Sequence, residues 1–223
     1  MKLTNIEKTF AVIFAVIVLL ELFSSQMQEV LPFHFSPKPL ILLSLIIYYL
    51  SQCKPLDRLT NSFMTLALIF SLGGDILLMF VDANANMFIM GLVSFLIAHI
   101  MYIVVFSKKR GRLNPLSLIL LLSAYTIGIL FLLFDGLGDL LIPVIVYMMV
   151  ILSMVVFAYM RKDKVANVSY YLVLIGAIFF VLSDSILAIN KFYEPLVYSH
   201  FLIMSTYATA QFLITLGILR QNQ

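Results

Sequence analysis

The sequence predicts an all-α, polytopic integral membrane protein with eight transmembrane helices and both termini in the cytoplasm. Of the 223 residues, 63% are hydrophobic and only 11% are charged, whereas the surface of a water-soluble domain needs far more charge. The apolar residues also gather in runs close to the roughly 20 residues that a helix needs to cross a bilayer. We therefore expect one transmembrane domain over residues 1–223.

Eight apolar runs are predicted to span the membrane. The first follows Lys2 and Lys8, and no small-x-small cleavage site comes after it, so we interpret it as an uncleaved span and not as a signal peptide. The second run is short, and the fifth and sixth are separated only by the letters DGLG. The predicted spans are residues 9–24, 38–51, 61–80, 87–106, 115–134, 138–161, 168–190 and 196–219.

The distribution of positive charge predicts the orientation. Of the fourteen Lys and Arg residues, twelve fall in the tails or the even-numbered connections, and only Lys38 and Lys191 fall on the other side. Because cytoplasmic loops carry an excess of Lys and Arg, both termini are predicted to be cytoplasmic, with the plasma membrane as the location in a bacterium. The run KKRGR at 108–112 is interpreted as a topology signal and not as a nucleic-acid-binding or lipid-binding segment, so no nucleic-acid partner is predicted.

Two aspartates stand inside predicted spans. Asp75 lies in SLGGDILLMF at 71–80, and Asp184 lies in FVLSDSILAI at 180–189. At a rise of about 1.5 Å per residue, the two lie roughly 7 Å and 9 Å below the outer ends of the third and seventh spans. A mid-span Asp costs about 2.5–3.5 kcal/mol on insertion scales, so packing alone is a poor explanation for two of them.

Other polar residues are predicted to share a pocket with these acids. Lys38 opens the second span at the outer side, His99 and Tyr102 are three residues apart on the fourth span, and Tyr207 and Gln211 are four apart on the eighth. Polar side chains within spans face the bundle interior or a water-filled cavity, so we expect a pocket that opens outward. The predicted catalytic residues are Asp75 and Asp184, and the predicted substrate-binding residues are Lys38, His99, Tyr102, Ser183, Tyr207 and Gln211.

Simpler interpretations stay open for several of these residues. Lys38 is alternatively a snorkelling anchor, and Tyr102 and Tyr207 alternatively form ordinary hydrogen bonds between helices. Glu21 is interpreted as a snorkelling residue near a helix end, and His200 as an interfacial residue.

Two acids in an apolar pocket indicate general acid chemistry. Burial disfavours the ionised form of a carboxyl group, so one acid is expected to donate a proton while the other stays anionic; the sequence does not assign the two roles. This arrangement suits a bond that is cleaved through an oxocarbenium-like state. No G-x-S-x-G, H-x3-H or H-E-x-x-H motif is present and Cys53 is the single cysteine, so neither a metal nor a cofactor is expected.

The chain resembles the YhhN-like lysoplasmalogenases, a family of eight-span membrane proteins. The matching pieces are KPL at 38–40, GDILL at 74–78, FLIAHIMY at 95–102, FFVLSDSILAINKF at 179–192 and YATAQFLI at 207–214. The resemblance implies hydrolysis of the vinyl ether bond of a lysoplasmalogen, a lysophospholipid, to a fatty aldehyde and glycerophosphoethanolamine or glycerophosphocholine. It also implies that Asp75 and Asp184 are the catalytic pair.

Two other classes of function remain as alternatives. A small proton-coupled transporter or lipid flippase would use the same carboxylates as proton relays, although transporters usually have broken spans around their site. Metal-dependent lipid amidase chemistry is the third option. The predicted partners are the lysophospholipid substrate and membrane lipids, and no oligomeric state is predicted.

Overall fold

All regular secondary structure in the described part of the chain is helical, which confirms the all-α class. The computed structural model describes residues 4–26 and 37–222, so Lys2 lies outside the described residues. The helices are α1 (Asn5–Gln26), α2 (Lys38–Gln52), α3 (Arg58–Leu78), α4 (Asn86–Ser107), α5 (Leu116–Leu137), the short 3-10 helix η1 (Gly138–Leu140), α6 (Leu141–Tyr159), α7 (Asn167–Phe192) and α8 (Ser199–Leu219).

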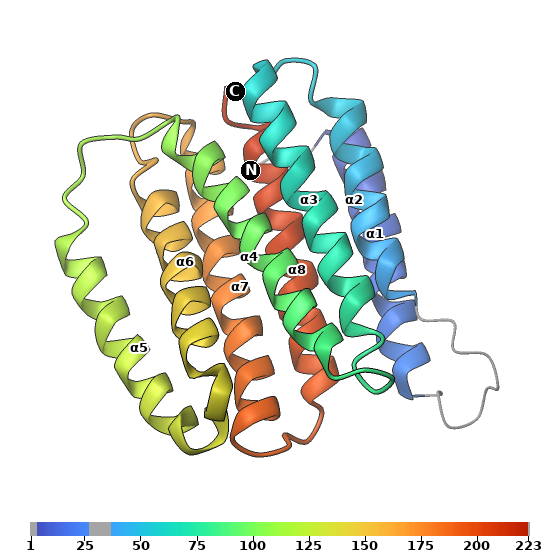
Figure 1. Ribbon diagram of the computed structural model, residues 1–223. Coiled ribbons are helices and arrows are strands. Elements are labelled where there is room, and N and C mark those ends of the chain that lie inside the picture. The colour runs from blue at the N-terminus through green and yellow to red at the C-terminus, as the bar shows by residue number, and fades with distance from the viewer. Residues whose placement is uncertain (1–3, 27–36, 223) are drawn as a thin grey trace.

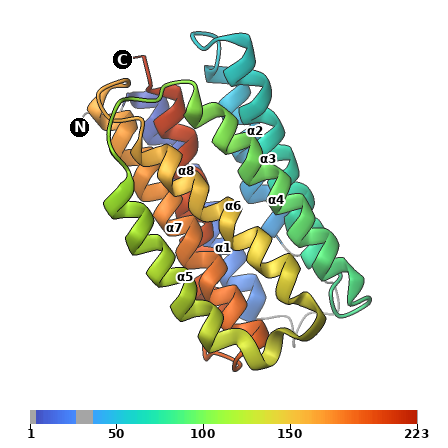
Figure 2. The ribbon, with the colours of Figure 1, turned by 60° about the vertical axis from the view of Figure 1, so that its left-hand side comes forward.

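The α-helices lie side by side and alternate in direction. The α2–α3, α4–α5 and α6–α7 connections gather at the end of the bundle where the two chain ends lie (Figures 1 and 2). We call this the terminal end and the opposite one the distal end. Lys38 begins α2 and Lys191 lies in the last turn of α7, so both are at the distal end.

The helices have the length and the surface of an integral membrane protein. Five stretches of described helix are long and apolar enough to cross a bilayer, namely Arg58–Leu78, Asn86–Ser107, Leu116–Tyr159, Asn167–Phe192 and Ser199–Leu219. Large apolar side chains such as Phe131, Ile127 and Ile142 point out of the bundle, which is typical of a surface that lipid covers. The eight-span count and the cytoplasmic location of the termini stay predictions.

The connection between α5 and α6 differs from the predicted one. Gly138 has a φ of 47°, a left-handed conformation that ends a helix readily because glycine has no Cβ. The sixth helix therefore begins at Leu141, after η1, and not at residue 138. Pro143 falls within the first turn of α6, where its missing N–H is tolerated.

The start of α3 is tied to the α4–α5 connection at the terminal end. The side chain of Asp57 caps α3 by accepting a hydrogen bond from the backbone N–H of Thr60 at 3.1 Å. The ammonium of Lys108 donates to the same carboxylate. This hydrogen bond holds the pKa of Asp57 well below its usual range.

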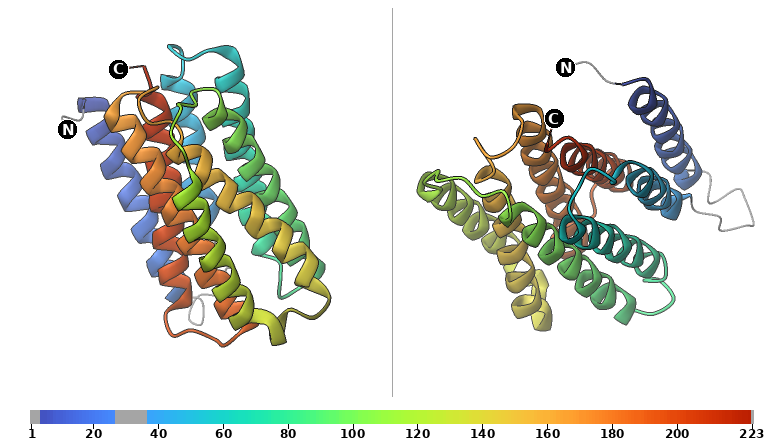
Figure 3. Two further views of the ribbon diagram at one scale, coloured as in Figure 1. Left: turned by 90° about the vertical axis from the view of Figure 1, so that its left-hand side faces the viewer. Right: turned by 90° about the horizontal axis from the view of Figure 1, so that it is seen from above.

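Close helix packing forms the core around which the polar residues lie. The closest approach is between α3 and α4, where a Cβ placed on Gly74 would lie 2.6 Å from the ring of Phe95. Between α7 and α8, a Cβ on Gly176 would lie 3.0 Å from the carbonyl oxygen of Ala210. The helix α5 stands at one edge of the bundle, as Figure 3 shows, and its buried residues Leu133 and Leu137 belong to its distal half.

Candidate active site

The two intramembrane aspartates occupy different surroundings. Asp75 lies in the last turn of α3 and is only 2% exposed. Asp184 lies on α7 and is partly exposed, because it lines a cavity. The charge on Asp75 is close enough to act on Asp184, but Asp75 is not among the residues that line this cavity.

Asp75 is held by a cation and a phenol from two other helices. The ammonium Nζ of Lys38 lies 3.7 Å from its Oδ1 atom, and the hydroxyl of Tyr207 on α8 donates a hydrogen bond to its Oδ2 atom at 2.9 Å. A buried carboxylate is stable only when it is paired and hydrogen-bonded. The surroundings of Asp75 therefore suit the ionised form.

A buried hydrogen-bond network extends from this group. The hydroxyl of Tyr102 donates to Oε1 of Gln211 at 2.6 Å. The amide nitrogen of Gln211 in turn contacts Ser71 Oγ at 3.0 Å and Tyr207 Oη at 3.4 Å. Five of the residues predicted for the site thus lie together, namely Lys38, Asp75, Tyr102, Tyr207 and Gln211.

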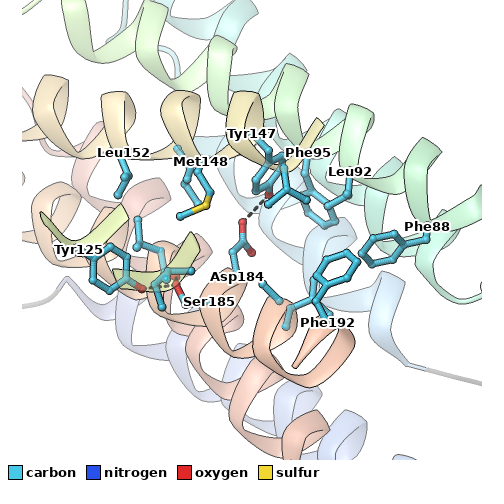
Figure 4. A pocket seen from close by; sticks show the side chains of 16 residues that line it. Phe88, Leu92, Phe95, Tyr125, Tyr147, Met148, Leu152, Asp184, Ser185 and Phe192 are labelled. Carbon is cyan, nitrogen blue, oxygen red and sulfur yellow. Dashed lines mark hydrogen bonds between the residues drawn. The ribbon is translucent and has the colours of Figure 1, made fainter. Parts of the chain in front are cut away.

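Asp184 has a single printed hydrogen-bond partner of a different kind, a neutral phenol. The hydroxyl of Tyr147 on α6 donates to Asp184 Oδ2 at 2.5 Å (Figure 4). One carboxyl oxygen is thereby fixed, and the other is left toward the cavity. The sequence analysis missed Tyr147, although it is one of the few hydroxyl-bearing residues in the run 138–161.

The cavity next to Asp184 is apolar and elongated. It holds about 660 Å³ of space between the side chains, its open mouth included. Its lining runs from Phe88 and Phe192 at the distal ends of α4 and α7 to Leu152, farther along α6. Besides Asp184, the polar lining consists of Tyr125, Tyr147 and Ser185, and the hydroxyls of Tyr125 and Ser185 bond to each other at 2.5 Å.

Aromatic rings separate the surroundings of the two acids. The ring of Phe180 lies edge-on to Tyr207, the partner of Asp75, with centroids 5.5 Å apart. The ring of His99 lies 4.6 Å from Phe180 and 5.4 Å from Tyr147, the partner of Asp184. The predicted single hollow shared by both acids is therefore two adjacent environments joined by a layer of rings.

His99 is placed inside this layer with its polar atoms unused. It is fully buried, and neither ring nitrogen has a hydrogen-bond partner among the described residues. Buried polar groups normally have a partner, which can be an ordered water. The position of His99 between the phenols of the two acids makes it a candidate to contact water or substrate, as the sequence analysis expected.

Ser183 lies elsewhere. Its hydroxyl donates to the backbone carbonyl of Ile203 on α8 at 3.0 Å, and its side chain is buried. This geometry joins α7 to α8 and does not support the predicted contact with substrate. Glu21 differs too from the snorkelling residue expected, because it is only 1% exposed and lies 3.3 Å from His200 Nε2.

The arrangement offers a proton donor at an apolar cavity and a paired anion behind it. Asp184 is the accessible carboxyl group, whereas Asp75 is enclosed with its cation. Within the described part of the chain, no three His, Cys, Asp or Glu side chains gather as a metal-binding group.

The family comparison covers both environments. A model described as the YhhN family matches residues 33–218, which include every predicted site residue. This chain belongs to the YhhN family. No solved structure shows a significant match to it.

Named relatives of this YhhN protein are lysoplasmalogenases. It is 32% identical over 154 residues to human lysoplasmalogenase TMEM86B, covering 69% of this chain and 62% of the relative. It is 30% identical over 163 residues to human lysoplasmalogenase TMEM86A, covering 70% and 65%, and 29% identical over 164 residues to Bos taurus lysoplasmalogenase TMEM86A, again covering 70% and 65%. The matches span less than two thirds of these relatives' lengths.

Proposed function

We propose that this protein hydrolyses the vinyl ether bond of lysoplasmalogens. The products are a fatty aldehyde and glycerophosphoethanolamine or glycerophosphocholine. The observation that carries the proposal is Asp184, fixed by Tyr147 at the wall of an elongated apolar cavity. An alkenyl chain needs such a cavity, and a vinyl ether needs an acid beside it. The names of the relatives support the same substrate class.

Asp184 is the proton donor in this proposal. Its proton bonds to the vinyl carbon β to the ether oxygen, using the electron pair of the double bond, and the oxygen then shares the positive charge of an oxocarbenium ion. Water adds to the cationic carbon and gives its proton to the Asp184 carboxylate. The resulting hemiacetal collapses to the aldehyde and the glycerol hydroxyl.

Asp75 supplies negative charge and does not contact the substrate in this proposal. Lys38 and Tyr207 hold it as a carboxylate, and its charge acts on the cavity across the layer formed by Phe180 and His99. A fixed charge in a medium of low dielectric stabilises a developing cation without reorganisation. The prediction that Lys38 binds the substrate phosphate is replaced here by a role in pairing Asp75.

The proposed topology has eight spans with the terminal end in the cytoplasm. The alternating direction of the helices supports it, as does the gathering of basic residues in the connections of the terminal end. The vinyl ether bond of a lipid lies just below its glycerol. A lipid of the leaflet at the distal end would thus bring this bond to the depth of Asp184.

Product analysis on the purified protein tests the reaction. Lysoplasmalogen incubated in water enriched in ¹⁸O should yield fatty aldehyde and a glycerophospho product without the label, because protonation at carbon leaves the glycerol oxygen in place. An ¹⁸O label in the glycerophospho product would contradict the proposed bond cleavage. Transport of intact lipid across vesicles with no aldehyde would favour the transporter or flippase instead.

A further inference from the structure

The distal end of the cavity carries a cation that the proposed reaction does not use. Lys191 lies seven residues after Asp184 on α7, so the two side chains leave the same face of the helix, since seven residues make nearly two turns. The spacing along the helix axis is about 10 Å. Both residues therefore belong to the side of α7 that faces the cavity.

Contacts place the ammonium of Lys191 beside the lining of the cavity. Its Nζ lies 5.3 Å from the centroid of the Phe88 ring. Phe88 packs edge-on against Phe192 with centroids 5.7 Å apart, and both phenylalanines line the cavity. Lys191 itself is exposed, so it can meet a ligand that enters from this end.

The balance of charge at the distal end singles out Lys191. Of the fourteen Lys and Arg residues, only Lys38 and Lys191 belong to this end. Lys38 lies 3.7 Å from Asp75, and its charge is therefore already offset by a buried carboxylate. Lys191 is thus the cation at this end that stands by the cavity.

We propose that Lys191 binds the phosphate of the substrate headgroup and so sets the position of the vinyl ether bond against Asp184. The proposal rests on the proposed function. Seven bonds separate the protonated carbon from phosphorus, or roughly 8 Å in an extended chain at about 1.5 Å or less per bond. A lysine side chain is flexible enough to cover the remaining difference from the spacing to Asp184. The alkenyl chain then runs toward Leu152.

A pair of substrates separates this role from a general effect on the enzyme. The first is an alkenyl-glycerophosphocholine and the second is the matching alkenylglycerol, which has the same vinyl ether and no phosphate. Lys191→Met should raise KM for the phosphorylated substrate about five- to tenfold, the loss expected for an exposed charge-assisted contact. It should leave kcat for that substrate and both constants for the alkenylglycerol within twofold.

Two control variants complete the experiment. Lys191→Arg keeps the positive charge and should keep KM near the wild-type value, whereas Lys164→Met removes an exposed cation at the terminal end and should change nothing. An unchanged KM in Lys191→Met, or an equal rise for both substrates, would overturn the role of Lys191. Failure of the wild-type protein to cleave either substrate would instead refute the proposed function.

Discussion

Tyr147 is the residue that distinguishes the proposed donor from the second acid. Its hydroxyl fixes one oxygen of Asp184 at 2.5 Å, whereas Asp75 is held by Tyr207 and a lysine. A neutral partner lets Asp184 carry a proton, and a cationic partner favours the anion. The two roles that the sequence left unassigned thus follow from what each carboxyl group touches.

Removing this hydroxyl should slow the chemical step. We expect Tyr147→Phe to lower kcat by about ten- to a hundredfold with KM within threefold, because a hydrogen bond to a charged group contributes roughly 1.5–3 kcal/mol. Steady-state aldehyde release measures both constants. The matched control is Tyr125→Phe, which removes another hydroxyl of the same cavity, bonded to Ser185 and not to Asp184. Equal losses in kcat for both variants would contradict a specific role for Tyr147.

The sequence was informative about the site where polarity was out of place. Asp75, Asp184, Tyr207 and Gln211 stand out because charged or amide groups are costly in a span. An aromatic residue in an apolar run looks like ordinary packing, so Tyr147 gave little signal. The pairing of Lys38 with Asp75 depends on how α2 approaches α3, which no spacing within either helix reveals.

At the scale of the elements, hydrophobic runs predicted where the helices lie. Each predicted span overlaps one α-helix, and most bounds differ by only a few residues, because a long apolar run has few alternatives to a helix in lipid. The sixth span is the exception at its start, where the left-handed Gly138 and the 3-10 turn come first. The sequence also gave no sign that aromatic rings from α4 and α7 would separate the two acids.

The contact of α3 with α4 connects helix packing to the cavity. A methyl group at Gly74 would meet the Phe95 ring at 2.6 Å, and Phe95 lines the cavity. We expect Gly74→Ala to destabilise the protein by about 1–3 kcal/mol and to reduce activity, since overpacking displaces the ring. Thermal unfolding in detergent and aldehyde release give the two readouts.

Gly128 on α5 provides the matched control for that substitution. A Cβ at this position would have nothing within 4 Å, so Gly128→Ala should leave stability unchanged or raise it by about 0.5–1 kcal/mol, the difference in helix preference. Equal melting temperatures for Gly74→Ala and the wild type would show that α3 and α4 do not pack as closely as described.

At the scale of the whole molecule, the charge distribution predicts which end faces the cytoplasm. In a Cys53→Ser background, Asp82→Cys in the α3–α4 connection should react with a membrane-impermeant maleimide added to spheroplasts. Lys162→Cys in the α6–α7 connection should react only after the membrane is permeabilised. Both positions are exposed, so accessibility reports the side of the membrane. The reverse pattern would invert the topology and place Lys191 on the cytoplasmic side.

The whole bundle also explains why the site lies near one end. Five helices, α3, α4, α6, α7 and α8, contribute the acids, their phenols and the rings between them. This places the acids beside the lining of an apolar cavity whose distal end is marked by Phe88 and Phe192. A lipid could present its headgroup there and extend its chain along the cavity without leaving the membrane.

Aldehyde release by the aspartate variants tests the central claim most directly. Asp184→Asn keeps the shape of the side chain but has no proton to give to carbon, so it should retain the melting temperature of the wild type and lose more than about 99.9% of kcat, in the range expected for a general acid. Asp75→Asn should lose less, because it removes a charge and not the donor. Turnover near the wild-type rate in folded Asp184→Asn would contradict the account.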